Sequence, residues 1–342
     1  MVTKGTVSAH LLAVSCRLTE RQRAEVADVI GDAARIVYLA EMTPPERRQA
    51  IETAAVLLCR NTDEELSSVE IPLLANARLV QFITAGVDFI QLHKLPAVPL
   101  ASNAGAHAES MAEHAVTMAL AGAKRLLLEH TNIKRGSFNQ TIRTKLLSGG
   151  TCGILGYGGA GRAIAQRMRC LGMKIHAIGR RNEPHESADR IGTLEHLDEM
   201  LATADVLIVA LALNRSTRDL IGSRELSHMK RDAILVNIAR GEIIDQHALY
   251  RHLQRQPDFV ACLDAWWTEP ARHGRFELEL PFLDLPNVIG SPHNSAAGGE
   301  GRDKAIRRAA ENCYRVLVGN TPQNLISDED RSSPSVMQGD RT

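Results

Sequence analysis

The sequence predicts an α/β protein of two domains, one of which has the doubly wound parallel sheet of the Rossmann fold. Three observations support this prediction. The chain has 342 residues, which is enough for two separate hydrophobic cores. Short apolar runs alternate with charged, helix-prone stretches, as in βαβ units. A glycine-rich turn in the segment 151–181 joins an apolar strand pattern to a helix pattern.

The N-terminal third of the chain contains four apolar runs that predict strands of a parallel sheet, separated by helix-prone stretches such as ERQRAEVADVIGDA. The runs are SAHLLAVSC, ARIVYLA, AAVLLC and RLVQFITA. A long helix is expected next, over 109–128, because Met111, Ala115, Met118 and Ala119 recur on one face. Such a helix could bridge domains or subunits. Near the C-terminus another helix is expected over 301–317.

The glycine-rich turn is expected to bind a dinucleotide. A strand is predicted at 152–155, and Gly156 then permits a tight turn. Gly158 leaves room for a pyrophosphate, Gly161 lets the next helix pack closely, and the free N–H groups at the start of that helix would face the phosphates. A purely structural turn is the weaker alternative, because the helix pattern that follows is regular and stops at Gly172. The predicted binding residues are Gly156, Gly158, Gly159, Ala160 and Gly161.

The residues after the second strand of this unit bear on the choice of cofactor. NAD sites usually have an Asp or Glu there, which accepts hydrogen bonds from the ribose 2′-hydroxyl. This chain has Gly179, Arg180 and Arg181 instead. Two guanidinium groups can bind a 2′-phosphate, and no carboxylate stands in the sequence there to repel it. We therefore expect NADP(H) to be preferred and NAD(H) to be a second cofactor; the alternative is that the arginines are solvated surface charges.

Three later strands are each followed by polar residues. These strands are predicted at 233–237, 259–263 and 288–290. In an open α/β sheet the ligand crevice lies outside the carboxyl ends of the strands, so Arg240, Glu269 and His293 should converge beside a nicotinamide. Each residue alone would more often be structural or solvent-facing, but the three in this order favour a catalytic set.

Composition limits the class of partner. Forty Lys and Arg residues balance forty Asp and Glu residues, so no net field favours nucleic acid or an anionic membrane. The six cysteines lack metal-ligand spacing, and several lie in apolar segments as reduced thiols would, so we expect no metal site and a cytoplasmic protein. The N-terminus lacks a secretory signal pattern, and no apolar run is long enough to span a bilayer. A small molecule is the expected partner.

Several motifs, in order along the chain, resemble those of the D-isomer-specific 2-hydroxyacid dehydrogenases: ITAGVDFI, SNAGAHAESMAEHAV, GYGGAG, VNIARGEIID, CLDAWWTEP and SPHNSAAG. The resemblance covers most of the chain. It implies that the Rossmann domain is inserted into a smaller, flavodoxin-like α/β substrate domain, with the active site in the cleft between them. The expected boundaries are 1–101 and 298–326 for the substrate domain, 102–297 for the nucleotide domain, and 327–342 for a polar, disordered tail.

The resemblance also implies roles for individual residues. His293 would be the general acid that protonates the carbonyl oxygen as hydride arrives at C2. Glu269 would fix the tautomer of that ring and stabilise its imidazolium form. Arg240 would bind the substrate carboxylate with its two-pronged donor set and polarise the ketone. The N–H groups of Ala85 and Gly86 would donate to the same carboxylate.

The implied cofactor site extends beyond the glycine turn. The family usually has Leu-Pro where this chain has Leu211-Ala212, which predicts looser packing against the adenine. Its further members would be Gly179, Arg180, Arg181, Leu211, Ala212, Thr217, Ile238, Ala239, Arg240, Asp264, His293 and Asn294.

Two pairs of residues are weaker candidates for the substrate site. His107 and His114 lie at or near the start of a predicted helix, and a structural role is the favoured interpretation for both. Trp266 and Trp267 are expected mainly to pack in the core, although one of them could shape the substrate pocket.

Within the family, NADP preference joined to this Arg, Glu and His set most resembles glyoxylate and hydroxypyruvate reductases. The predicted protein is a homodimer that reduces a small 2-oxo acid to the D-2-hydroxy acid. Two alternatives stay open: a dinucleotide-sensing protein like the C-terminal-binding-protein corepressors, and a reductase of sugar-derived 2-oxo acids. A formate dehydrogenase is disfavoured, because those enzymes pair the histidine with Gln rather than with an acid such as Glu269. No regulatory extension of the phosphoglycerate dehydrogenase kind is expected.

Overall fold

The computed structural model describes residues 10–180, 183–298 and 301–332. The chain forms two compact units. The first comprises 1–106 together with 299–342, and the second is the continuous segment 107–298. The second unit is therefore an insertion into the first, and its ends lie a few residues from the predicted boundaries.

The first unit contains a parallel sheet with the strand order β2-β1-β3-β4-β5, which is the flavodoxin order. Its strands are β1 (Leu11–Val14), β2 (Arg35–Tyr38), β3 (Val56–Cys59), β4 (Leu79–Phe82) and β5 (Leu100–Ala101). Its α-helices are α1 (Glu20–Ile30), α2 (Pro44–Thr53), α3 (Thr62–Glu65), α11 (Gly301–Leu317) and α12 (Asp328–Ser332).

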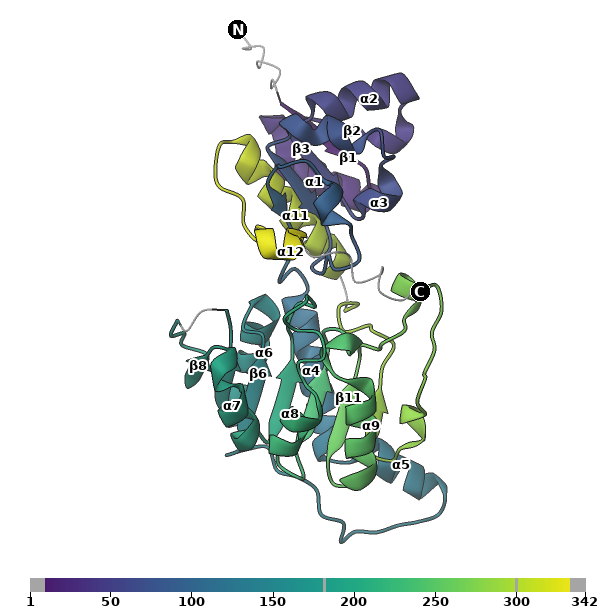
Figure 1. Cartoon of the computed structure of the whole chain (residues 1–342), viewed down its shortest axis with the longest axis vertical. Coiled ribbons are helices and arrows are strands. Elements are labelled where there is room, and N and C mark those ends of the chain that lie inside the picture. Colours follow the sequence, from purple (N-terminus) through teal and green to yellow (C-terminus); the bar gives the residue numbers. More distant parts are fainter. Residues whose placement is uncertain (1–9, 181–182, 299–300, 333–342) are drawn as a thin grey trace. The chain divides into compact units, whose positions relative to one another are not determined.

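Side chains alternate across this sheet, so each strand contributes to two cores. Leu12 and Val14 of β1 point to the face that α1 and α11 cover, whereas Leu11 and Ala13 point to the α2 face. Figure 1 shows α11 beside α1, although about 270 positions separate them in the sequence. The C-terminal segment therefore completes a core that the N-terminal segment begins.

The prediction of a disordered tail from 327 is wrong for its first residues. The segment Asp328–Ser332 forms α12, and Arg331 donates hydrogen bonds to the backbone oxygens of Val98 (2.9 Å) and Leu95 (2.8 Å). A polar composition is compatible with order here because a guanidinium group satisfies several carbonyls at once. Residues 333–342 lie outside the described part of the chain.

The second unit contains a parallel sheet in the order β12-β11-β10-β9-β6-β7-β8, the Rossmann arrangement with one further strand. Its strands are β6 (Thr151–Leu155), β7 (Lys174–Ile178), β8 (Arg190–Gly192), β9 (Val206–Val209), β10 (Ile234–Asn237), β11 (Val260–Leu263) and β12 (Val288–Gly290). Its α-helices are α4 (Ala108–Ala123), α5 (Leu126–Lys134), α6 (Gly159–Cys170), α7 (Leu197–Thr203), α8 (Ser223–His228), α9 (Gln246–Arg255) and α10 (Pro270–His273).

Helices cover both faces of this sheet. Cys152 and Ile154 of β6 lie in the core that α4 and α6 form on one face. Gly153 between them faces α7, where an added Cβ would come within 3.1 Å of Met200. The helices α7, α8 and α9 follow one another along that second face (Figure 1). The sheet is thus doubly wound, as the sequence predicts.

The single long helix predicted over 109–128 is wrong, because the structure has two helices there. Arg125 adopts a left-handed φ of +52° and separates α4 from α5. The predicted face of α4 is correct in part, since Ala115, Met118 and Ala119 are buried. The helix direction changes where those core contacts stop, and α5 has no buried residue.

The described residues contain neither a candidate membrane-spanning helix nor a candidate metal-binding cluster. No helix in this part of the chain is long and apolar enough to cross a membrane. No group of three or more His, Cys, Asp or Glu side chains there is arranged to hold a metal ion.

Candidate active site

His293 and Glu269 form a close pair in the second unit. The Nδ1 atom of His293 lies 2.8 and 2.7 Å from the two carboxylate oxygens of Glu269. Nδ1–H therefore donates to the carboxylate, and Nε2 is the ring nitrogen left for a substrate. The His293 side chain is 31% exposed and that of Glu269 only 6%. The buried carboxylate therefore holds the imidazole ring through Nδ1, and the ring itself is partly open to solvent.

Glu269 is anionic at neutral pH. Burial raises the pKa of its carboxyl group, but the hydrogen bond and charge of His293, the N–H of Trp266 and the charge of Arg240 together outweigh burial and lower the pKa below its usual value. The backbone N–H of Trp266 donates a hydrogen bond to Oε1 of Glu269 at 2.7 Å. Glu269 is also the N-cap residue of α10, and its backbone N–H donates to Nδ1 of His273 at 3.1 Å.

Asp264 holds the loop that carries His293. Its fully buried carboxylate accepts hydrogen bonds from the Ser291 hydroxyl (2.6 Å) and from the N–H groups of Asn294 (3.0 Å) and Ser295 (3.1 Å). The backbone oxygen of Asp264 accepts the N–H of His293 at 2.9 Å. Burial alone would raise the pKa of Asp264, but bonds from His114, Ser291 and Ser295 hold it well below its usual range.

These bonds constrain an unusual backbone. His293 has a left-handed φ of +49°, which costs a residue with a Cβ roughly 1 kcal/mol or more. Hydrogen bonds to Asp264 from the residues on both sides keep the loop in this conformation. The sequence places Asp264 only near the cofactor; its role as the anchor of the His293 loop depends on contacts that span about 30 positions.

Arg240 follows the adjacent strand. Its backbone oxygen accepts a hydrogen bond from the side-chain amide of Asn237 at 2.8 Å, and its Nη1 donates to the oxygen of Ala239 at 2.8 Å. Its charge lowers the pKa of Glu269, so the two groups interact. Arg240, Glu269 and His293 thus follow the neighbouring strands β10, β11 and β12 and gather at one edge of the sheet.

The glycine turn fits a pyrophosphate. Gly156 has φ +108°, and an added Cβ would lie 2.6 Å from the backbone of Ala210. A Cβ at Gly161 would meet the Gly156 oxygen at 2.1 Å, whereas a Cβ at Gly158 would meet no atom within 4 Å. The start of α6 at Gly159 has no side-chain cap. Open space thus lies beside uncapped N–H groups, which is what a phosphate requires.

The predicted 2′-phosphate residues are described only in part. The N–H of Gly179 donates to the oxygen of Gly192 at 3.0 Å, which joins the ends of β7 and β8. Arg180 is exposed. Arg181 lies outside the described residues. Their contact with a cofactor stays a prediction.

Thr217 has a contact that the sequence does not reveal. Its hydroxyl donates to the oxygen of Ala212 at 2.8 Å and accepts the N–H of Asn214 at 2.9 Å. Thr217 therefore braces the loop that contains Leu211 and Ala212. Of the other predicted cofactor residues, Ile238 and Ala239 are buried after β10, whereas Asn294 is exposed.

Ala85 and Gly86 belong to the first unit, in the loop after β4. Among the described residues, no protein acceptor is found for their N–H groups.

The two histidines near the start of α4 differ in their contacts. Nε2 of His114 lies 3.0 Å from the Ser291 hydroxyl and 3.4 Å from Asp264, which favours a structural role, and His107 occupies the N-cap without a side-chain cap bond.

Both tryptophans pack as expected. Trp266 is 3% exposed and its Nε1–H donates to the oxygen of Ser291 at 2.8 Å. Trp267 stacks on Phe282 with ring centroids 5.1 Å apart. These contacts lie within the second unit and support the loops on which Glu269 and His293 stand.

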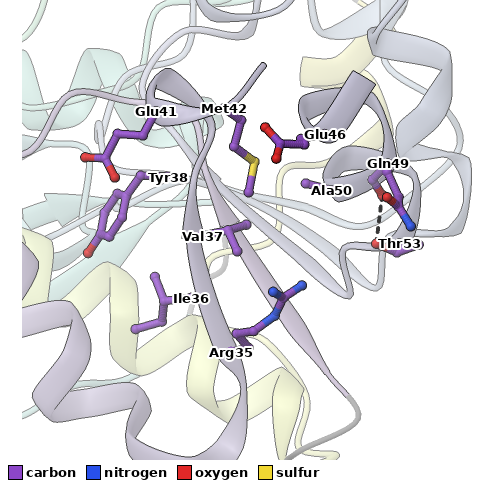
Figure 2. Close-up of a pocket in the computed structure, with 10 residues that line it drawn as sticks. All are labelled: Arg35, Ile36, Val37, Tyr38, Glu41, Met42, Glu46, Gln49, Ala50 and Thr53. Carbon is purple, nitrogen blue, oxygen red and sulfur yellow. Dashed lines mark hydrogen bonds between the residues drawn. The ribbon is translucent and has the colours of Figure 1, made fainter. Parts of the chain in front are cut away.

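A separate hollow of about 530 Å³ lies in the first unit (Figure 2). It runs along the edge strand β2, from Arg35 to Tyr38, and is also lined by Met42 and by residues of α2 such as Gln49. It follows the side of the sheet rather than the carboxyl ends of the strands, and none of the predicted site residues lines it.

Comparisons with known proteins identify the family of this chain. Residues 116–295, more than half of the chain, match the family model for the D-isomer specific 2-hydroxyacid dehydrogenase NAD-binding domain. A D-3-phosphoglycerate dehydrogenase of Methanocaldococcus jannaschii is 28% identical over 92% of this chain, which spans only 59% of that protein. A glyoxylate/hydroxypyruvate reductase B of Yersinia pestis is 28% identical, with coverage of 83% of this chain and 87% of the relative.

Solved structures show the same similarity. The structure of a D-isomer specific 2-hydroxyacid dehydrogenase family protein from Aeromonas salmonicida is 25% identical with a TM-score of 0.73, and the match covers 94% of this chain and 99% of that one. Together with the match of the family model, these findings assign the fold and the general chemistry. The chain belongs to the D-isomer specific 2-hydroxyacid dehydrogenases, a family of NAD(P)-dependent oxidoreductases.

Proposed function

We propose that this protein reduces a small 2-oxo acid, of the size of glyoxylate or hydroxypyruvate, to the D-2-hydroxy acid, with NADP(H) as the preferred cofactor. The observation that carries this proposal is the His293–Glu269 pair, with Arg240 beside it at the carboxyl ends of three adjacent strands. Similarity to a glyoxylate/hydroxypyruvate reductase B adds support for the size of the substrate.

In this proposal Arg240 binds the substrate carboxylate through its planar fork. The N–H groups of Ala85 and Gly86 donate to the same carboxylate. NAD(P)H, when bound, supplies the hydride that reaches C2 of the oxo acid. His293 transfers the proton from Nε2 to the carbonyl oxygen, and Glu269 stabilises the positive imidazolium before that transfer.

The residues that would hold the cofactor are those around the glycine turn and the neighbouring strand ends. Gly158 and the N–H groups of Gly159, Ala160 and Gly161 would face the pyrophosphate. The loop braced by Thr217 would adjoin the adenine. Asp264, Ile238, Ala239 and Asn294 would border the nicotinamide, and Arg180 with Arg181 would bind the 2′-phosphate.

The test is a panel of 2-oxo acids of increasing length, assayed with NADPH and NADH in parallel. We expect the highest kcat/KM for two- and three-carbon acids with NADPH. Absence of turnover with every 2-oxo acid, under conditions where the purified protein binds NADPH, would contradict the proposal and favour a dinucleotide-sensing role. Higher kcat/KM for longer sugar-derived acids would revise the substrate class only.

A further inference from the structure

We propose that the buried ion pair between Glu242 and Arg272 is a positioning device, which holds the segment carrying Arg240 in register with the segment carrying Glu269. The inference rests on the proposed function, because it assigns a purpose to the relative placement of two residues that act in it. Glu242 and Arg272 are positioning residues and are not proposed to touch the substrate.

The pair is buried and two-pronged. Glu242 is 8% exposed and Arg272 is 7% exposed. Nη1 of Arg272 lies 2.9 Å from Oε2 of Glu242, and Nη2 lies 2.5 Å from Oε1. Two parallel bonds between a guanidinium and a carboxylate fix orientation as well as distance, so the pair admits few alternative arrangements of the two segments.

Each partner lies within one helical turn of a predicted active-site residue. Glu242 belongs to a 3₁₀ turn, Gly241–Ile243, which begins directly after Arg240. Arg272 lies in α10, where its N–H donates to the backbone oxygen of Glu269 at 3.2 Å. A shift of the ion pair would therefore be transmitted to both residues through very short stretches of chain.

Two further contacts bring the same segments together. A Cβ at Gly241 would lie 2.4 Å from the backbone carbon of Trp266, so the two backbones are in direct contact. Nε1–H of Trp267 donates to the oxygen of Ile244 at 2.8 Å. These contacts set how closely the segments approach, whereas the fork between Glu242 and Arg272 fixes how far one can slide along the other.

Stability alone does not explain this pair. Replacing a buried ion pair by apolar side chains of similar volume is often neutral for folding, because the desolvation of two charges offsets their attraction. What apolar side chains do not reproduce is a directional, two-point contact. The distance between Arg240 and Glu269 matters because the energy of two interacting charges varies inversely with their separation.

The experiment compares the wild type with the double variant Glu242→Met/Arg272→Met, which removes both charges at similar volume. The matched control is Arg47→Met/Glu70→Met in the first unit, where another ion pair is largely buried, with side chains 20% and 15% exposed. The readouts are thermal unfolding, kcat and KM for a 2-oxo acid, and the dissociation constant of NADPH. A further readout is the NMR signal of the His293 Nδ1–H proton, identified by its loss in His293→Asn.

We expect the Glu242/Arg272 double variant to stay folded and to bind NADPH within about threefold of the wild type, while kcat/KM falls more than about tenfold. The Nδ1–H signal should shift or broaden, and the control variant should change neither. A folded double variant with the wild-type kcat/KM and an unchanged signal would overturn the proposal. If the double variant does not fold, Arg272→Lys, which keeps the charge but loses the fork, is judged by the same two readouts.

The two proposals fail in different ways. If the wild type reduces no 2-oxo acid, the proposed function is wrong. The NMR comparison still decides whether the ion pair holds the segment that carries Glu269 in place, because the His293 Nδ1–H proton bonds to Glu269 and its signal requires neither substrate nor cofactor.

Discussion

His293 combines a left-handed backbone with a ring fixed by Glu269, so a substitution there acts on two properties at once. We predict that His293→Ala lowers kcat by at least about 10²-fold, because the proton donor is lost, and leaves NADPH affinity nearly intact. His293→Asn is the matched variant, since Asn tolerates left-handed φ better than Ala. Steady-state kinetics and fluorescence titration with NADPH check both variants. Near-normal turnover in either would remove His293 from the mechanism.

Glu269 provides a prediction about pH. Its lowered pKa keeps the carboxylate charged at neutral pH, and that charge favours the imidazolium form of His293. Glu269→Gln retains a hydrogen-bonding side chain but removes the negative charge that attracts the proton on Nδ1 of His293. We expect the alkaline limb of kcat/KM for 2-oxo acid reduction to move to lower pH. A profile that superimposes on the wild type would mean that Glu269 only orients the loop.

The grouping of Arg240, Glu269 and His293 could be predicted from the sequence because each follows a short apolar strand, and parallel strands bring their carboxyl ends together. The contacts that hold these three residues in place could not be predicted from the sequence. His114 and Ser291 are separated by 177 positions, and Glu242 and Arg272 by 30, and no local pattern connects either pair. The sequence predicts Asp264 as a residue near the cofactor but not as the anchor of the His293 loop, because that role depends on the fold of separate segments.

At the scale of elements, the end of β7 decides cofactor preference in our proposal. Gly179 offers no carboxylate to a ribose, and a single charge-assisted bond from Arg180 to a 2′-phosphate is worth about 1.5–3 kcal/mol before screening, which is at least about tenfold in affinity. We predict that the wild type has the higher kcat/KM with NADPH. Gly179→Asp with Arg180→Ile should reverse this preference. A wild type that already prefers NADH would show that the arginines are surface charges.

The helix α5 and the segment after it provide a prediction about assembly. Several large apolar side chains there are strongly exposed: Leu126 (60%), Leu127 (48%), Ile133 (58%), Phe138 (75%) and Leu146 (73%). Large apolar side chains exposed to this degree favour burial against another protein surface. We expect the protein to be a homodimer and Leu126→Glu/Ile133→Glu to make it monomeric in light scattering. Val69→Glu, at a position 67% exposed in the first unit, is the control. A monomeric wild type at micromolar concentration would contradict this.

The break between α4 and α5 shows where sequence patterns lose their power. The apolar spacing of α4 predicts most of its buried face, but the same spacing continues past Ala123, beyond the last core contacts. Periodicity reports which residues could share a face. It does not report whether the rest of the fold supplies a surface for that face, and at Arg125 the backbone turns away.

At the scale of the whole molecule, the second unit has a core built from its own residues. We predict that the fragment 107–298 folds cooperatively and binds NADPH when it is expressed alone. The fragment 1–106 should not fold, because it lacks the α11 residues Ile306, Val316 and Leu317. Burying these three contributes roughly 5–9 kcal/mol, comparable to the whole stability of a domain. Thermal denaturation of both fragments is the measurement, and cooperative unfolding of 1–106 would contradict the prediction.

The insertion also has a consequence for synthesis on the ribosome. The face of the first sheet that carries Leu12 and Val14 is finished only when α11 emerges, some 200 residues after the first segment is complete. At a translation rate of about 5–20 residues per second, that apolar face stays uncovered for roughly 10 to 40 s, while the nucleotide unit is translated and can fold. The N-terminal half-domain is therefore the part of the nascent chain most in need of a chaperone.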